Sequence, residues 1–377
     1  MCFILFVLHK NENKFVKGLM QSEMSISTVT EDIVSLGASA AAQILDEEDK
    51  KNIDMVIVGT ESGVDQSKAS AVFIHHLLNI QPFARCIEIK EACYGATAAL
   101  SFAKNYIEKN NDASVLVIAS DIARYGIDTP GESTQGAGSV AMLIKKDPAI
   151  AVINDENVCQ TRDIMDFWRP NYSDFPYVDG HFSTKQYLDC LTTTFEEYKK
   201  RYNQSLDDFD AFCFHLPFPK LGLKAINSIL EKNIEKEIKN DFLEKFHTSI
   251  IYGKRVGNIY TGSLYLSLLS LLENCENLNG GDKIGMYSYG SGAVCEFFNL
   301  TLAEGFKNHL RCDRLNDFEN RKQLSMEEYE NMFFEKIVLD EEGNCDFSNN
   351  KFIQESDNSF VLAKIENHKR VYKKLNE

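Results

Sequence analysis

Short apolar runs punctuate the chain, and they occur in the same order in its two halves. Each run is rich in Val, Ile, Leu, Met or Phe and is bounded by polar or turn-forming residues, which is typical of buried strands. The predicted strands are 54–60, 114–120 and 138–144 in the first half, and 210–214, 283–288 and 292–298 in the second. This order indicates one long duplication rather than a short structural repeat.

Each half also contains a helix that is apolar on all sides. Residues 94–103 and 261–272 include no Asp, Glu, Lys or Arg, and leucines surround the second segment. A helix of this kind is buried on all sides. Residues 33–45 instead concentrate their apolar side chains on one face, which predicts a surface helix covering a sheet. Two covered sheets with a buried helical layer between them give a five-layered αβαβα fold of the α/β class.

The apolar run Cys2–Leu8 has seven residues, far fewer than the roughly 20 that span a bilayer. It also lacks the basic segment and cleavage site of a secretory signal, so we expect a strand in a sheet and a cytoplasmic protein. The formal net charge is −16, and no basic run offsets it. This charge disfavours binding to nucleic acid or to an anionic membrane.

The chain contains ten cysteines without a CxxC pair and eight histidines without an HxH or HExxH arrangement. We therefore expect reduced thiols and no metal site. Cys93 is the exception of interest, because it stands among small residues where the first apolar helix begins. The positive end of the helix dipole is expected to lower the thiol pKa and favour a nucleophilic thiolate. A buried structural cysteine is the alternative.

Two more residues stand at equivalent places in the duplication. Glu61 and His215 end equivalent strands, as Cys93 and Asn258 begin equivalent helices. Taken singly, Glu61 could cap a helix starting near Ser62, and His215 could be an ordinary core histidine. Taken together, a pseudo-twofold axis would bring all four side chains into one pocket, with Glu61 as a base whose pKa is raised by apolar surroundings.

Seven motifs carry a family resemblance. They are GTESGVDQSKA (59–69), EACYGATAAL (91–100), ASDIARYG (119–126), DFWRP (166–170), FHLPFPK (214–220), VGNIYTGSLYLSLLSLLEN (256–274) and YSYGSGAV (287–294). From about Asn13 to its end the chain resembles bacterial 3-hydroxy-3-methylglutaryl-CoA (HMG-CoA) synthases of the thiolase-like superfamily. The resemblance implies a duplicated thiolase-like αβαβα fold, with one half over 1–150 (Glu61, Cys93) and the other over 151–377 (His215, Asn258).

The resemblance also implies roles for residues. Cys93 corresponds to the nucleophile that carries the acyl group, Glu61 to the general acid/base and His215 to a second acid/base. The positions that would contact substrate are Thr134, Ser183, Lys224, Asn258 and Ser291, and Lys220 and Lys224 would supply positive charge for CoA phosphates. Each has a simpler reading, as turn residues (Thr134, Ser183), a solvated helix charge (Lys224), a helix cap (Asn258) or a small loop residue (Ser291).

The implied reaction condenses acetyl-CoA with acetoacetyl-CoA, gives HMG-CoA for mevalonate synthesis and needs no metal or redox cofactor. A homodimer is implied as well. One alternative is a β-branching enzyme of polyketide assembly that uses the same three residues with an acceptor bound to acyl carrier protein. Another is an inactive scaffold that keeps the duplicated fold.

Overall fold

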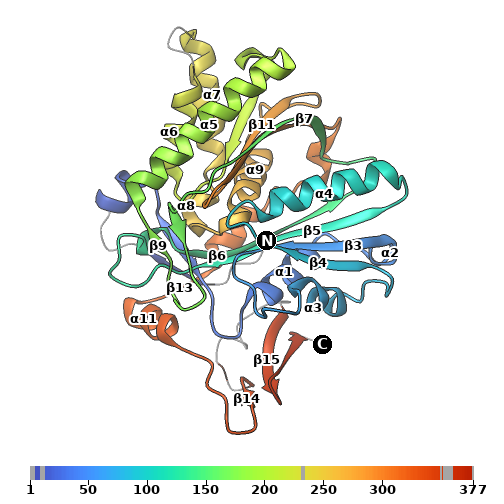
Figure 1. The fold of residues 1–377 in the computed structure, drawn as a ribbon, viewed down its shortest axis with the longest axis vertical. Helices are drawn as coiled ribbons and strands as arrows, with labels where there is room; N and C mark the ends of the chain where they lie inside the picture. Colours follow the sequence, from blue (N-terminus) through green and yellow to red (C-terminus); the bar gives the residue numbers. More distant parts are fainter. Residues whose placement is uncertain (1–4, 9–12, 231–233, 349, 351–359, 376–377) are drawn as a thin grey trace.

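The computed structural model describes residues 5–8, 13–230, 234–348, 350 and 360–375 (Figure 1). Two four-stranded mixed sheets form its centre. The first has the order β4 (Arg85–Ile89), β3 (Ile53–Gly59), β5 (Ser114–Ala123), β6 (Gly136–Ile144). The second has the order β10 (Ala211–Phe214), β11 (Lys283–Gly290), β12 (Val294–Leu302), β7 (Ala151–Thr161).

The sheets repeat one pairing pattern, as the duplication predicts. Strands β3 and β5 are parallel and β6 runs antiparallel to β5. In the second sheet β10 and β11 are parallel and β12 runs antiparallel to β11. All six predicted strands are present, with ends shifted by a few residues.

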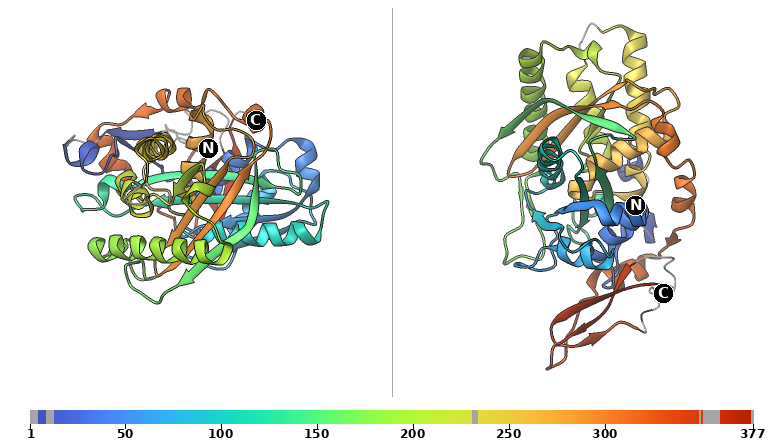
Figure 2. Two further views of the ribbon diagram at one scale, coloured as in Figure 1. Left: turned by 90° about the horizontal axis from the view of Figure 1, so that it is seen from above. Right: turned by 90° about the vertical axis from the view of Figure 1, so that its right-hand side faces the viewer.

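Three helical layers enclose and separate the sheets (Figures 1 and 2). The middle layer is formed by α4 (Gly95–Lys109) and α9 (Ser263–Asn274), whose side chains share one hydrophobic core with both sheets. Helices α1 (Ile33–Ala42) and α3 (Ser70–Leu77) pack on the first sheet. Helices α5 (Gly180–Tyr202), α6 (Pro219–Ile229) and α7 (Lys236–Ser249) pack on the second. The predicted αβαβα layering is confirmed.

The two helices of the middle layer differ in burial. Helix α9 has no exposed residue, as predicted. Helix α4 is buried only along the side that faces the sheets, and its Phe102 is 61% exposed. The prediction of burial on all sides is therefore wrong for α4, because no described element covers its outer face.

Helix α1 departs from expectation in the opposite direction. Asp32 caps it through the backbone N–H groups of Val34 and Ser35, and nine of its ten residues are buried. Its outer side is covered by a small sheet of β14 (Cys345–Asp346), β15 (Phe360–Glu366) and β16 (Lys369–Lys374), which projects from one end of the molecule (Figure 2). The predicted surface helix is thus an interior one.

Strand β1 (Leu5–Leu8) confirms the expected N-terminal strand over these residues, while Cys2–Ile4 lie outside the described part. It pairs with β2 (Glu23–Ile26) and β13 (Lys322–Gln323). The remaining elements are η1 (Asn13–Lys17), α2 (Glu47–Asn52), η2 (Glu132–Thr134), β8 (Phe167–Trp168), β9 (Tyr177–Val178), η3 (Leu206–Asp208), α8 (Gly253–Val256), η4 (Tyr260–Gly262), η5 (Phe306–His309), α10 (Arg314–Glu319) and α11 (Met326–Phe334). In the described residues no helix is long and apolar enough to cross a membrane.

Candidate active site

Cys93 and Glu61 meet where β3 and α4 come together. The Cys93 thiol donates a hydrogen bond to Glu61 Oε1, with 3.6 Å between sulfur and oxygen. The contact depends on Gly59 at the end of β3, since a Cβ there would lie 2.4 Å from the backbone nitrogen of Ala96 in α4. The absence of a side chain lets the strand end approach the first turn of the helix. No helix begins at Ser62, so Glu61 is not the helix cap that the alternative reading required.

The surroundings of Cys93 hold its proton on the sulfur. Burial raises the pKa of the thiol well above its ordinary value, and Glu61, Asp121 and their neighbours add to the shift. The expected lowering by the helix dipole is therefore wrong for the resting site. Burial of the thiol and the negative charges of Glu61, Asp121 and Asp166 account for the raised pKa. Cys93 also precedes the first residue of α4 by two positions.

The carboxyl of Glu61 is likewise biased toward its neutral form. Burial and the nearby Asp121 raise its pKa above the ordinary value, and Arg169 and the Cys93 hydrogen bond oppose the shift. A carboxyl with a raised pKa is suited to take up and return a proton near neutral pH. Next to a thiol, this arrangement supports acid–base chemistry.

Asp121, at the end of β5, fixes the loop that carries Glu61. Its Oδ1 atom accepts hydrogen bonds from the Thr60 hydroxyl at 2.8 Å and the Glu61 amide at 3.0 Å. The Ser62 hydroxyl donates to the same atom at 2.8 Å. On the opposite side, the Arg169 guanidinium donates to the Glu61 carbonyl oxygen. The Glu61 backbone is thereby held from two sides.

A second buried carboxylate, that of Asp166, accepts hydrogen bonds from residues of the second half. Asp166 accepts hydrogen bonds from the hydroxyls of Ser183 at 3.0 Å and Tyr289 at 2.8 Å, and from the Gly292 amide at 2.9 Å. Ser291 precedes Gly292 in the turn between β11 and β12. The structure thus brings the predicted residues Ser183 and Ser291 together through Asp166, whose charge also contributes to the shift at Cys93.

Asn258 connects the second half to residues of the first half. Its Nδ2 donates to the Tyr125 hydroxyl at 2.8 Å, and its Oδ1 accepts from the Tyr260 amide and the Ser263 hydroxyl. Its backbone N–H donates to the carbonyl of Thr134, another predicted residue, at 3.0 Å. Asn258 lies five residues before α9, so it shapes the turn ahead of the helix. The prediction that it begins the helix is wrong.

Three aromatic rings surround the thiol. Tyr125, Phe167 and Tyr260 lie with their ring centroids 6.0 Å apart in each pair, and they form one apolar cluster with Cys93 and Ala123. Such a lining excludes water from the sulfur, which strengthens electrostatic interactions there.

His215 follows β10 as Glu61 follows β3, and it is 2% exposed. Burial lowers its pKa to about 3, so the imidazole is neutral at physiological pH. Its Nδ1 has no hydrogen-bond partner among the described residues, in contrast to a satisfied core histidine. Its backbone is fixed by the Tyr287 carbonyl and the Tyr187 hydroxyl. No hydrogen bond within the described ranges joins His215 to Cys93 or Glu61.

Lys220 and Lys224 lie on α6, which begins with Pro219 shortly after His215. With Leu223, Asn227 and Ser228 they line a shallow depression of about 420 Å³. The Lys220 ammonium donates to the Lys17 carbonyl at 3.4 Å, and Lys224 is exposed. The two cations therefore lie at the surface, close in sequence to the buried histidine.

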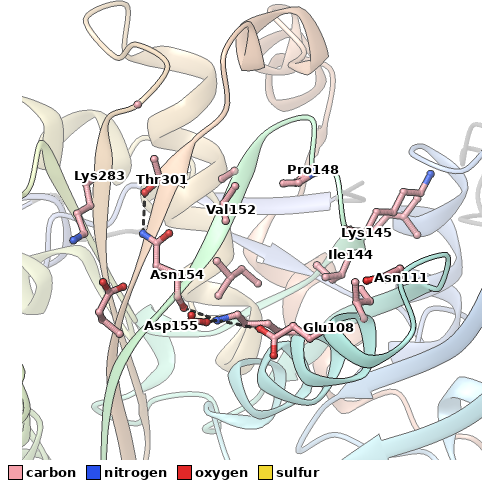
Figure 3. A pocket seen from close by; sticks show the side chains of 18 of the residues that line it. Glu108, Asn111, Ile144, Lys145, Pro148, Val152, Asn154, Asp155, Lys283 and Thr301 are labelled. Carbon is pink, nitrogen blue, oxygen red and sulfur yellow. Dashed lines mark hydrogen bonds and ion pairs between the residues drawn. The ribbon is translucent and has the colours of Figure 1, made fainter. Parts of the chain in front are cut away.

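A larger cleft of about 970 Å³ lies elsewhere (Figure 3). Side chains from α4, β6, β7 and the second sheet line it, including Glu108, Lys145, Asn154 and Lys283. None of the predicted site residues lines this cleft, and its lysines lie among a similar number of carboxylates. The candidate catalytic residues and this cleft are thus in separate places.

Sequence reasoning missed Asp121, Asp166, Tyr125 and Arg169 as parts of the site. All four fall inside the motifs ASDIARYG and DFWRP. Their place in these motifs is the signal by which they could have been found. In the described residues no group of three His, Cys, Asp or Glu side chains is placed to hold a metal ion.

The duplicated fold and a buried cysteine beside a carboxyl define the class, a thiolase-like enzyme of acyl transfer. The sequence models of the hydroxymethylglutaryl-coenzyme A synthase N-terminal and C-terminal domains match residues 8–149, and 152–243 with 222–375, respectively. The chain belongs to the HMG-CoA synthase family.

Individual relatives agree with this assignment. The hydroxymethylglutaryl-CoA synthase of Enterococcus faecalis is 50% identical over 328 residues, 87% of this chain and 85% of that protein. The polyketide biosynthesis 3-hydroxy-3-methylglutaryl-ACP synthase of Bacillus subtilis is 33% identical over 339 residues, 84% of this chain and 80% of the relative. A crystal structure of an HMG-CoA synthase complexed with CoA matches with a TM-score of 0.94 and 57% identity, covering 97% of this chain and 93% of that one.

Proposed function

We propose that this protein is a hydroxymethylglutaryl-CoA synthase, which condenses acetyl-CoA with acetoacetyl-CoA and water to give HMG-CoA and CoA. The observation that carries the proposal is the contact between the Cys93 thiol and the Glu61 carboxyl. It supplies a nucleophile and a base within one dry site, which is what a two-stage condensation requires.

The first stage transfers the acetyl group. Cys93 sulfur attacks the thioester carbon of acetyl-CoA, the bond from that carbon to the CoA sulfur breaks, and CoA leaves with the proton given up by Cys93. Because burial keeps Cys93 protonated at rest, the proton must move as the sulfur attacks. The ionised fraction of Glu61 is the acceptor already hydrogen-bonded to it.

The second stage forms the carbon–carbon bond. Glu61 removes a proton from the methyl group of acetyl-Cys93, and the resulting enolate attacks the ketone carbon of acetoacetyl-CoA. The new alkoxide needs a hydrogen-bond donor and then a proton. We assign the role of hydrogen-bond donor to His215, as a neutral imidazole rather than a cation, since burial lowers its pKa to about 3. The proton that the alkoxide gains is balanced by the one that Glu61 removed from the methyl group, so the Glu61 carboxyl returns to its ionised form. Water then cleaves the Cys93 thioester and restores the thiol.

Binding of the CoA phosphates requires local positive charge in a protein of net charge −16. Lys220 and Lys224 provide it on α6, in the turns that follow His215. We infer that Thr134, Ser183, Asn258 and Ser291 contact the acyl and pantetheine portions. The steps are an acyl transfer, proton transfers, the addition of an enolate to a ketone and a hydrolysis. None of them moves electrons to or from a redox group, so we expect no metal or redox cofactor.

A carrier-protein acceptor is the second candidate, supported by the 33% identity to the B. subtilis ACP synthase. The higher identity to the E. faecalis CoA synthase favours free CoA thioesters. An acceptor assay with acetoacetyl-CoA and with acetoacetyl-acyl carrier protein separates them. The Cys93–Glu61 contact argues against an inactive scaffold, which has no need to keep it.

We also infer a homodimer that forms along the edge of the first sheet. Strand β4 is at that edge and pairs only with β3 among the described strands. Phe83, just before β4, is 92% exposed, and Phe102 is 61% exposed on α4, which packs against β3 and β4. A free edge strand pairs with a second copy across a twofold axis without new chemistry.

The decisive experiment is to trap labelled acetyl on Cys93. The protein is mixed with radiolabelled acetyl-CoA, quenched and digested, and the label is located by mass spectrometry. We expect it on the peptide with Cys93, and absent from the Cys93→Ser variant under the same quench. Condensation is followed in parallel as consumption of acetoacetyl-CoA. Label on another residue, or acetylation without condensation, would refute the proposed function.

A further inference from the structure

The second half contains a structural counterpart of Cys93. Ala92 and Tyr260 both have positive φ angles, 40° and 43°, which are rare for residues with side chains. Helix α4 begins three residues after Ala92, and α9 begins three residues after Tyr260. In this alignment Thr261, and not Asn258 as the sequence predicted, takes the place of Cys93 ahead of the equivalent helix.

Thr261 is buried and makes two hydrogen bonds into the first half. Its hydroxyl oxygen accepts from the Ala96 amide, in the first turn of α4, at 2.7 Å. Its own amide donates to Asp121 Oδ2 at 3.3 Å. The other oxygen of Asp121 accepts from the Glu61 amide. Thr261 is therefore connected to the helix behind the nucleophile and, through Asp121, to the loop that carries the base.

We propose that Thr261 is a positioning residue, which sets the separation of Cys93 and Glu61 by holding α4 and Asp121 in one register. The inference rests on the proposed function of these two residues. Thr261 does not contact either reacting atom. Its effect comes through the backbone, since the amide of Ala96 and the amide of Glu61 belong to the segments that the two side chains extend from.

A purely structural role makes a different prediction, and the chain offers a matched comparison. Thr97, one residue further along α4, is buried and bonds through its hydroxyl to Ser288 and Tyr265 of the second half, each at 2.7 Å. It joins the same two halves but has no link to Asp121 or Glu61. Loss of either hydroxyl removes a buried hydrogen bond. Only loss of the Thr261 hydroxyl should change the thiol–carboxyl geometry.

The test compares Thr261→Val, Thr261→Ser and Thr97→Val in the full-length protein. The first measurement is the rate at which iodoacetamide alkylates Cys93 as a function of pH, read on the Cys93 peptide by mass spectrometry. The second is kcat and KM for condensation, and the third is the thermal midpoint. Alkylation needs no CoA substrate, so it reports on the geometry of the site even in a protein that does not condense. A wild-type protein without condensation activity would refute the proposed function but would leave the inference on Thr261 testable.

We expect Thr261→Val to lower kcat about 10- to 100-fold, because small displacements of reacting groups are costly, with little change in KM. Its alkylation profile should move to lower pH, since Glu61 is one of the groups that raise the thiol pKa. Thr261→Ser should restore both properties. Thr97→Val should lower the thermal midpoint but leave the profile in place.

Three results would overturn the inference. They are a wild-type alkylation profile in Thr261→Val, failure of Thr261→Ser to restore it, and an equal shift in Thr97→Val. If Thr261→Val does not fold, Thr261→Ala removes the same oxygen with a smaller side chain and is judged by the same comparison.

Discussion

At the scale of single residues, the candidate catalytic part of the site is built from uncharged groups. Burial raises the pKa of both Cys93 and Glu61 and lowers that of His215, so each group is biased toward its neutral form. Keeping these three side chains uncharged avoids the free-energy cost of burying unpaired charge. Reactivity then depends on moving a proton between groups in contact, which is why the separation of Cys93 and Glu61 matters.

Glu61→Gln should separate the two stages. Gln keeps the size of the side chain but does not accept a proton, and loss of a general base costs about 10²–10⁴ in rate. We expect condensation to fall at least ~100-fold, while acetyl-Cys93 still accumulates, more slowly than in the wild type. Mass spectrometry after mixing with acetyl-CoA, beside a condensation assay, measures both.

The pH dependence supplies the control for this variant. In the wild-type protein, condensation should rise with pH until Glu61 is ionised, at a pH above the ordinary range of a glutamate because its pKa is raised. In Glu61→Gln, rising pH should speed acetylation by ionising the thiol but should not rescue condensation. Undiminished condensation in this variant would contradict the assigned role.

His215→Ala should spare acetylation and impair the second stage. The described structure gives His215 no bond to Cys93, so the thiol does not depend on it, whereas its unpartnered Nδ1 is free for a ligand. We expect near-normal labelling of Cys93 and a condensation rate lower by about 10²-fold, as for loss of a hydrogen-bond donor to a developing oxyanion. A variant that is not acetylated would make His215 the base for the thiol.

The residues with chemistry of their own were accessible from the sequence, and those that act through the backbone were not. Cys93, Glu61 and His215 stand at the ends of predicted elements. Hydrophobic periodicity and the family motifs therefore identify them as candidate site residues. Asp121 and Thr261 act through hydrogen bonds to amides, which depend on contacts between distant segments. The expected low pKa of Cys93 was wrong for the same reason, because the burial and the carboxylates that raise it depend on contacts between distant segments.

At the scale of elements, the small sheet β14–β16 determines how deeply α1 is buried. Its Tyr372 hydroxyl and Arg370 guanidinium donate to Asp32 Oδ2 at 2.6 and 2.9 Å, and Asp32 also caps α1. This sheet converts α1 from a surface helix into an interior one. Sequence periodicity identified the apolar face of α1. It carries no information on the sheet that covers the other face, because that sheet is formed by residues more than 300 positions further along the chain.

Tyr372→Phe tests this coupling. The phenylalanine keeps the edge-to-face contact with Phe73 but leaves Asp32 with one donor fewer. We expect a loss of about 1–2 kcal/mol in the free energy of unfolding, measured as a lower midpoint in thermal or urea unfolding. The matched control is Tyr172→Phe, at a position 87% exposed, which should change little. Equal midpoints for the two variants would show that the hydroxyl does not stabilise α1.

At the scale of the whole molecule, duplication explains why the layering could be predicted. Two copies of one pattern must bury two apolar helices, and a shared middle layer buries both. Among the described residues the outer face of α4 stays exposed, so the shared layer does not bury this helix completely. Phe102 belongs to α4, which packs against the sheet whose edge strand is β4. Its exposure and the free edge of β4 are the basis of the proposed dimer.

Replacing both exposed phenylalanines tests the assembly. Burial of a phenylalanine contributes about 1.5–3 kcal/mol, so Phe83→Asp with Phe102→Asp should weaken dimerisation at least about 100-fold. We expect the wild-type protein to sediment as a dimer at micromolar concentration and the double variant as a monomer with unchanged secondary structure. Phe334→Asp, at a position 63% exposed on α11, removes a similar ring from another face and should leave the dimer intact. A double variant that remains dimeric would place the interface elsewhere, and a monomeric Phe334→Asp would move it to the face of α11.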